Sequence, residues 1–388
     1  MRIFIKVGIL PDLAGTTCHA CGCGSLFLTT CAGRGERTKI AGIEIENLVQ
    51  PLWRCDNMDC RRRIYNLDPN GPLDSLFGRG HVHPVRTLNA LSHILSVHAS
   101  NYCSSGELAC HAGMSEDGAQ AIADVVRAML ANGAQKEQED FKWKSGALLE
   151  ADESSMRVQR IPCPRTCRNA SCGAHEHGRH RLLHRRILCC GPRGDRTKAM
   201  FFELPEETCE AGGSGVPLSA AECDSILPAI LSPGPFVLLT DGAGAYQSVA
   251  PRERVAYHTK DHEPNQFSSA RYNEFYKHLN ISHGIVSHSA EQWAEVDRVQ
   301  VVHPSGQVRW KAIKKGTQQV DGLWPELRAS IPDSVHTSDW ARCRTYMWSW
   351  VWRMRRVGLD NLVEFGKLLS RLRQTEAQPA CKGRKRKH

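Results

Sequence analysis

The sequence predicts an α/β fold in which short buried strands alternate with helices. Two apolar runs, 147–151 and 236–240, are typical of strands, and each is followed directly by an aspartate, Asp152 and Asp241. A cysteine-rich segment and then a helical segment precede these strands. The length of 388 residues suggests two or three domains and is ample for a sizeable core.

The composition favours a globular protein with an anionic partner. Hydrophobic residues make up 41% of the chain, and the formal net charge of +9 at pH 7 favours binding to nucleic acid. No apolar run approaches the roughly 18 residues that span a membrane, and Lys6 interrupts the N-terminal apolar stretch, which makes it a poor signal peptide. We therefore expect an intracellular, reducing compartment, where the 17 cysteines are metal ligands and buried thiols rather than disulfides.

The first cysteine-rich segment, residues 15–70, has the spacing of a zinc ribbon. A tight C-x₂-C pair and a looser second pair can bend the chain around one tetrahedral ion, and residues 40–53 between them alternate like strands. The expected zinc ligands are Cys18, Cys21, Cys55 and Cys60. The wider second spacing leaves open that Cys23 or Cys31 replaces one of them.

Residues 84–140 predict a helical segment. Within it, 106–122 read as helix, glycine turn, serine cap and helix, which is the outline of a DNA-binding helix-turn-helix. Any helical hairpin shares this outline, and basic residues are scarce on the second helix before Arg127.

A third aspartate, Asp321, lies in a stretch that reads as the start of a helix. Two acids at strand ends and one on a later helix can converge on a pair of divalent metals. Hard cations such as Mg²⁺ take oxygen ligands, and two metals about 3.5–4 Å apart can clamp the attacking and leaving oxygens of a phosphoryl transfer. Because the chain has 41 acidic residues, roles in turns and helix caps are the alternative.

The motifs around these acids resemble those of the Merlin superfamily of DNA transposons and its bacterial insertion-sequence relatives. The family's first acid pair corresponds to Asp152-Glu153, and its Thr-Asp-Gly…Tyr motif to residues 240–246. Its third motif, Thr-Asn-x-x-Glu-Gly-x-Trp-x-x-Leu-Lys, is matched by Thr317, Gln318, Asp321, Gly322, Trp324, Leu327 and Arg328. The resemblance covers roughly residues 15–356 and is interrupted after the first acid.

Three positions depart from the family pattern: Gln318 replaces Asn, Asp321 replaces Glu, and Arg328 replaces Lys. Asp for Glu shortens the reach of the carboxylate by one methylene, which still allows metal binding if the helix lies closer. Glu326 is a nearby substitute, but it lies roughly 140° around the helix from Asp321. Asp321 is therefore the preferred third acid.

The resemblance implies an RNase H-like core, a mixed sheet flanked by helices, over residues 145–356. It implies that Asp152, Asp241 and Asp321 hold two Mg²⁺ or Mn²⁺ ions for DNA cleavage and strand transfer at transposon ends. Strand one is expected to end at Asp152, with a second strand at 155–159. The expected partners are double-stranded DNA, as terminal inverted repeats and target, and further copies of the chain in a homo-oligomer.

Basic residues near these motifs are the candidate DNA contacts: Arg328, Arg61, Arg62, Arg63 and Arg127. His288 lies in a stretch similar to another family motif and is a candidate phosphate contact, although a lone histidine is more often structural. Residues 340–356 are rich in tryptophan and arginine. We expect the tryptophans to pack on a core and the arginines to face DNA.

A cluster of cysteine and histidine is expected as an insertion in the core at about residues 160–195. Its candidate ligands for a second zinc are Cys163, Cys167, Cys172, His175 and His177. Three thiols and two imidazoles suffice for one closed zinc site. A basic, histidine-rich loop with incidental cysteines is the alternative.

The basic tail, residues 374–388, reads as a nuclear localisation signal, a DNA-binding arm or a solvated end. We expect the nucleus in a eukaryotic host and the cytoplasm otherwise. Two other functions stay open. One is a domesticated, catalytically inactive transposase descendant that acts as a zinc-containing DNA-binding protein. The other is a zinc-dependent protein-interaction module without a DNA role.

Overall fold

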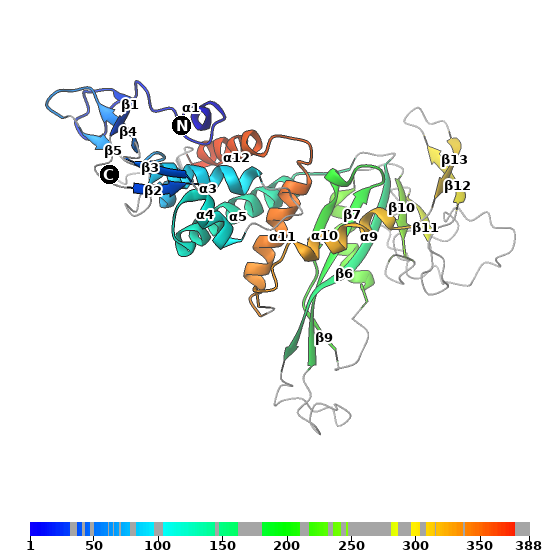
Figure 1. The fold of residues 1–388 in the computed structure, drawn as a ribbon. Helices are drawn as coiled ribbons and strands as arrows, with labels where there is room; N and C mark the ends of the chain where they lie inside the picture. Colours follow the sequence, from blue (N-terminus) through cyan, green and yellow to red (C-terminus); the bar gives the residue numbers. More distant parts are fainter. Residues whose placement is uncertain are drawn as a thin grey trace, which may run out of the picture. The chain divides into compact units, whose positions relative to one another are not determined.

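The chain divides into two compact units, Met1–Ala134 with Trp348–His388, and Gln135–Met347 (Figure 1). The computed structural model describes residues 1–31, 37–40, 43–46, 50–60, 62–64, 66–69, 71–77, 83–96, 104–143, 147–161, 181–209, 217–231, 236–241, 246, 281–285, 296–302, 308–314, 316–336 and 338–376. Within these ranges, no helix is long and apolar enough to cross a membrane.

The first unit begins with a short helix, α1 (Arg2–Lys6), and a small antiparallel sheet. The sheet order is β1-β4-β5, with bounds β1 (Leu26–Cys31), β4 (Gln50–Cys55) and β5 (Arg63–Ile64). A separate hairpin joins β2 (Arg37–Ile40) to β3 (Ile43–Glu46). The strand pattern expected at 40–53 is therefore present, and β4 delivers Cys55 at its end.

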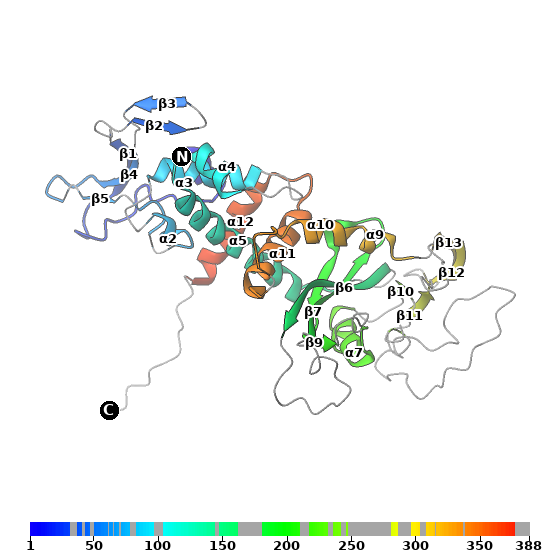
Figure 2. The ribbon, with the colours of Figure 1, turned by 60° about the horizontal axis from the view of Figure 1, so that its bottom comes forward.

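The other elements described in the first unit are helices (Figure 2). They are α2 (Asp74–Phe77), α3 (Pro84–Ser96), α4 (Ser105–Ala112), most of α5 (Glu116–Glu139), the end of α11 (Trp340–Met354) and α12 (Asn361–Glu376). Gly113 ends α4 in the left-handed region with φ 68°, and the Ser115 hydroxyl accepts the Gly118 N–H at 3.2 Å to start α5. The expected order of helix, glycine, serine cap and helix is thus present.

The C-terminal helices hold the first unit together. Trp348, Trp350 and Trp352 are buried, which confirms the expectation that these tryptophans pack on a core. From α12, the Arg373 guanidinium donates to the carbonyl of Gly8 at 2.7 Å and to the Asp68 carboxylate at 3.1 Å. These bonds connect the last helix to the beginning of the chain.

The second unit is built on a mixed sheet of order β11-β10-β6-β7-β8, with β9 paired to β7. The bounds are β6 (Leu148–Ile161), β7 (Arg181–Pro192), β8 (Met200–Glu203), β9 (Glu207–Cys209), β10 (Phe236–Thr240) and β11 (Ile281–Ile285). β6, β7 and β8 run antiparallel, whereas β10 is parallel to both β6 and β11. The predicted α/β class with a mixed sheet is therefore correct.

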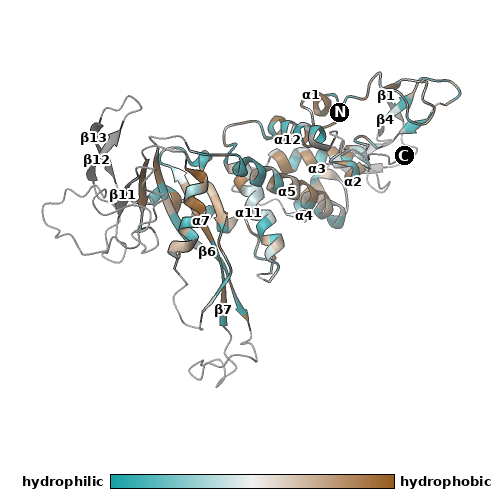
Figure 3. Cartoon of the chain, turned by 180° about the vertical axis from the view of Figure 1, so that it is seen from behind, coloured by the Kyte–Doolittle hydropathy of each residue, from teal (hydrophilic) through white to brown (hydrophobic). Residues whose placement is uncertain are grey.

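Helices flank both faces of this sheet (Figure 2). On one face α7 (Ala220–Ile230) starts with a capping box at Ser219 and packs Cys223 and Leu227 into an apolar core. Figure 3 shows the hydrophobic colouring of the sheet beside α7. On the other face lie α9 (Gln318–Asp321) and α10 (Leu323–Ala329). They follow the antiparallel strands β12 (Val296–Val302) and β13 (Val308–Lys314) in the chain. The short helix η1 (Arg196–Lys198) joins β7 to β8.

The first strand of the sheet is longer than the sequence predicted. It does not end at Asp152, and 155–159 are not a separate strand, because β6 continues to Ile161. The polar residues after Asp152 resemble a turn locally. Pairing with β7, including Asp152 opposite Cys189, continues the strand past them, with an irregularity between Ser155 and Arg157.

The last part of the segment predicted as an insertion, at about 160–195, belongs to the sheet itself. Residues 181–192 form β7, and its Cys189 and Cys190 are fully buried core thiols. The five candidate zinc ligands of this segment, Cys163, Cys167, Cys172, His175 and His177, lie outside the described residues, and a zinc site there stays a prediction.

Candidate metal centre and acidic site

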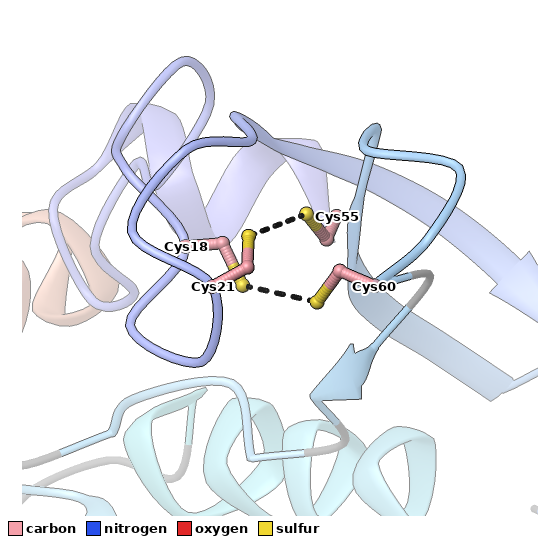
Figure 4. A group of neighbouring side chains, drawn as sticks. All are labelled: Cys18, Cys21, Cys55 and Cys60. Carbon is pink, nitrogen blue, oxygen red and sulfur yellow. Dashed lines mark hydrogen bonds between the residues drawn. The ribbon is translucent and has the colours of Figure 1, made fainter.

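Four cysteine side chains converge in the first unit (Figure 4). Their sulfur atoms all lie within 4.8 Å of one another, with Cys18 and Cys60 3.9 Å apart and Cys21 and Cys55 3.7 Å apart. A tetrahedral ion with Zn–S bonds of 2.3 Å would separate its sulfurs by about 3.8 Å. The cluster could therefore hold a metal ion, and its geometry is compatible with structural zinc.

Glycines shape the loop that carries the first pair. Gly22 has φ 66°, and the Gly24 N–H donates to the Cys21 sulfur at 3.3 Å. A Cβ at Gly24 would meet the Cys55 sulfur at 2.4 Å, so only glycine lets the two loops approach. The Asp56 carboxylate then accepts the Ser25 N–H at 2.7 Å and joins the loops from the other side.

The cluster favours a cation on electrostatic grounds. Hydrogen bonds from the backbone of Cys23 and Gly24 lower the pKa of the Cys21 thiol to about 6, whereas burial raises the pKa of Cys55 to about 12. One thiolate therefore forms readily, but further thiolates need a compensating positive charge. The alternatives Cys23 and Cys31 are not members of the group, and Cys23 is exposed and donates to the Cys21 carbonyl.

The three predicted aspartates approach one another in the second unit. Asp152 lies on β6, Asp241 directly follows β10, and Asp321 ends α9. The parallel register of β10 and β6 pairs Leu239 with Glu150, which brings Asp241 alongside Asp152. Burial, followed by the charges of Asp321 and Asp241, raises the pKa of Asp152 to about 8.

Two hydrogen bonds orient these carboxylates. The Trp324 indole N–H donates to Asp152 Oδ2 at 2.7 Å, and the Thr317 hydroxyl donates to Asp321 Oδ2 at 3.0 Å. Glu326, the alternative third acid, forms an ion pair with Arg196 instead. The structure therefore favours Asp321 over Glu326 as the acid that joins Asp152.

Sequence reasoning missed the residue that fixes α9. Glu150 is 1% exposed, and its carboxylate accepts the backbone N–H groups of Gln319 and Val320 at 2.9 and 3.2 Å. It also pairs with Arg193 at 2.5 Å, and Arg193 donates to the Gly316 carbonyl at 2.8 Å. The sequence did offer a signal, because Glu150 is a charged residue inside the apolar run 147–151. A carboxylate buried in a strand needs hydrogen-bond donors or a cation beside it, so its presence there indicates a structural role.

We expect Glu150→Ala to detach α9 from the sheet, because it leaves two helix N–H groups without their acceptor and Arg193 without its carboxylate partner. The expected loss is about 3–5 kcal/mol of local stability. Faster hydrogen exchange of the Gln319 and Val320 amides would report it. Glu203→Ala, which removes a partly exposed ion pair with Arg344, should leave those amides protected.

The candidate DNA contacts lie in different environments. Arg328 is exposed and donates to the Ser154 hydroxyl at the edge of the acidic site. Arg62 and Arg63 are exposed next to the cysteine cluster, whereas Arg61 and His288 lie outside the described residues. Arg127 is 5% exposed and pairs with Asp124, so it packs α5 rather than facing solvent.

Comparison with protein-family models, curated proteins and solved structures finds no match to this chain. Fold and site alone therefore define its class. It is a mixed α/β protein with a mixed sheet and a four-cysteine cluster that could hold a metal ion.

Proposed function

We propose that this chain is a DDE/DDD transposase-like enzyme that catalyses metal-dependent DNA cleavage and strand transfer at transposon ends. The observation that carries the proposal is the approach of Asp152, Asp241 and Asp321 from a strand, a strand end and a helix. Their mutual repulsion acts on Asp152 in a largely buried position. A cluster of oxygen donors with excess negative charge suits a hard divalent cation.

The sheet supports an RNase H-like core. The family resemblance implies a meander that begins with the strand bearing the first acid, and β6, β7 and β8 form an antiparallel meander with Asp152 on its first strand. The parallel strand β10 then brings the second acid beside the first. The third acid comes from a helix after the last strand pair, in the order that the resemblance implies.

The chain's own residues would orient the reacting groups. Asp152, Asp241 and Asp321 would hold Mg²⁺ or Mn²⁺, which when bound stabilises charge on attacking and leaving oxygens. Trp324 orients the Asp152 carboxylate, Thr317 orients that of Asp321, and Glu150 fixes the helix that carries Asp321. In the proposal, the exposed Arg328 binds a DNA phosphate beside the site.

The first unit would recognise the DNA ends. In this proposal the four cysteines form a zinc ribbon, α4 and α5 form a helix-turn-helix, and Arg62 and Arg63 contact phosphates. The burial of Arg127 removes one expected contact on α5. Action on two ends calls for a homo-oligomer, and in a eukaryotic host the enzyme would work in the nucleus.

The test is incubation of the purified chain with labelled duplexes that carry candidate terminal repeats, with Mg²⁺, Mn²⁺ or a chelator. We expect strand cleavage that requires the metal. Cleavage that persists in the chelator would contradict the proposal.

A catalytically inactive, domesticated DNA-binding protein is the second candidate. Among the described residues, only the four cysteines form a group close enough to hold an ion as it stands, and the three aspartates do not. Trp324 also occupies one oxygen of Asp152. This protein would bind duplex DNA with a steep salt dependence and leave it uncut in Mn²⁺.

The acidic site predicts an unusual pH dependence of stability. Because the folded pKa of Asp152 is about 8, above its ordinary value of 3.8, folding without metal is favoured by protonation and weakened as pH rises from about 4 to 8. Each pKa unit corresponds to about 1.4 kcal/mol. Asp152→Asn should therefore become progressively more stable than the parent between pH 5 and 8, as measured by denaturation in chelator. A pH-independent difference would contradict this.

A further inference from the structure

The turn that follows β7, residues 192–196, binds side chains of both α9 and α10. The Gln319 side chain of α9 accepts the Gly194 N–H at 2.6 Å and donates to the Pro192 carbonyl at 3.2 Å. From α10, the Glu326 carboxylate accepts from the Arg196 guanidinium at 2.9 Å. Because Gln319 precedes the third aspartate in the chain and Glu326 follows it, the turn holds the segment that carries this acid on both sides.

The backbone of this turn is fixed to the strand of the first aspartate. Gly194 has φ 93°, a left-handed conformation that favours glycine. The Arg193 N–H donates to the Leu148 carbonyl of β6 at 2.8 Å, and β7 pairs Cys189 with Asp152 just before the turn. The turn therefore continues the strand pair that carries Asp152 and connects that strand to α9 and α10.

We propose that Gln319 and Arg196 are positioning residues that set the affinity of the acidic site for a divalent cation. This inference rests on the proposed metal-binding role of Asp152, Asp241 and Asp321. These three carboxylates are not close enough to hold an ion as they stand, so the geometry in which they meet depends on where α9 lies. Residues that hold metal ligands in place from outside the coordination shell typically change metal affinity by about 10–100-fold when they are replaced.

The contacts of the turn are separate from the buried carboxylate that holds the start of α9. Glu150 accepts backbone N–H groups of α9, including that of Gln319, and these bonds do not involve the Gln319 side chain. Gln319→Ala therefore removes both bonds to the turn and leaves the backbone acceptor of α9 in place. The side chains of Arg196 and Glu326 are both partly exposed, so loss of this pair alone costs little stability.

The charge of Arg196 makes the direction of the effect informative. Removal of a positive charge from the surroundings of an acidic site favours cation binding on electrostatic grounds. Loss of the contact that holds α10 is expected to weaken cation binding instead. Lys198 is the matched control, because it carries the same charge in η1 but forms its ion pair with Asp195 of the same turn.

Mn²⁺ binding to the full chain, followed by electron paramagnetic resonance without DNA, tests the proposal. Only the Mn²⁺ that is lost in Asp321→Asn is assigned to the acidic site. We expect Gln319→Ala and Arg196→Ala each to raise the Kd of this ion about ten-fold, and Arg196→Lys to restore part of the affinity. Lys198→Ala should bind Mn²⁺ at least as tightly as the parent.

An unchanged Mn²⁺ affinity in Gln319→Ala and Arg196→Ala, together with a lower Tm, would overturn the proposal, since the turn would then only stabilise the helices. A parent chain without an Asp321-dependent Mn²⁺ ion would overturn it as well. A parent that binds this ion but leaves DNA uncut contradicts the transposase function alone, and weaker binding in Gln319→Ala would still support the positioning role. If the parent cleaves, saturating Mn²⁺ should restore the parent rate to both variants, because the ligands themselves are intact.

Discussion

Asp241→Asn is expected to lower the rate of metal-dependent DNA cleavage by about a thousand-fold or more. The change keeps the size of the side chain but removes one negative charge directly after β10, beside Asp152. An amide is a weaker ligand for a hard cation than a carboxylate. Single-turnover cleavage of a labelled duplex, measured over a range of Mn²⁺ concentrations, gives the rate and the metal dependence together.

Asp333→Asn is the matched control, because Asp333 is an exposed acid in a turn after α10. It should cleave at the parent rate, and both variants should bind duplex DNA as tightly as the parent does. If Asp241→Asn cleaves as fast as Asp333→Asn, the three aspartates are not the catalytic centre. If the parent itself binds without cutting, the second candidate function is favoured.

Loss of the four-cysteine site is expected to have the largest effect on stability. Structural zinc contributes on the order of 10 kcal/mol to the folding of small zinc peptides at neutral pH. The core around this cluster is small, with Cys18, Leu26 and Cys55 as its buried members. Cys55→Ser should therefore unfold β1 and β4, which hydrogen exchange of their amides would detect.

Cys23→Ser provides the control in the same loop, since Cys23 is exposed and outside the cluster. It should leave exchange in β1 and β4 unchanged. The amides of β6 and β10 should be protected in both variants, because the second unit has its own core. Equal protection of β1 in Cys55→Ser and Cys23→Ser would show that the cluster does not stabilise the sheet.

Local signals allowed part of this fold to be predicted. The boundaries of β10 follow from a short apolar run that ends at an aspartate, and the turn between α4 and α5 follows from Gly113 and Ser115. The four clustered cysteines follow from their spacing. Each of these features is encoded within a few neighbouring residues.

Features that depend on distant partners were not predictable. The continuation of β6 past Asp152 depends on pairing with β7, and the role of Glu150 depends on Arg193 and on Gln319, far along the chain. The burial of Arg127 likewise reflects the packing of α5 rather than its own helical spacing. A sequence pattern identifies residue types, but it does not show which distant groups will satisfy a buried charge.

The contacts along β6 have a consequence for how this chain can change. Glu150 binds the start of α9, Ser154 accepts from Arg328 of α10, and Arg157 donates to the carbonyl of Ile331 just beyond it. The contacts of α9 and α10 with β6 therefore set the position of Asp321, and the length of the polypeptide before α9 does not. Insertions between β11 and β12 can therefore accumulate in related chains while the acidic site keeps its geometry, because a longer connection costs little additional entropy.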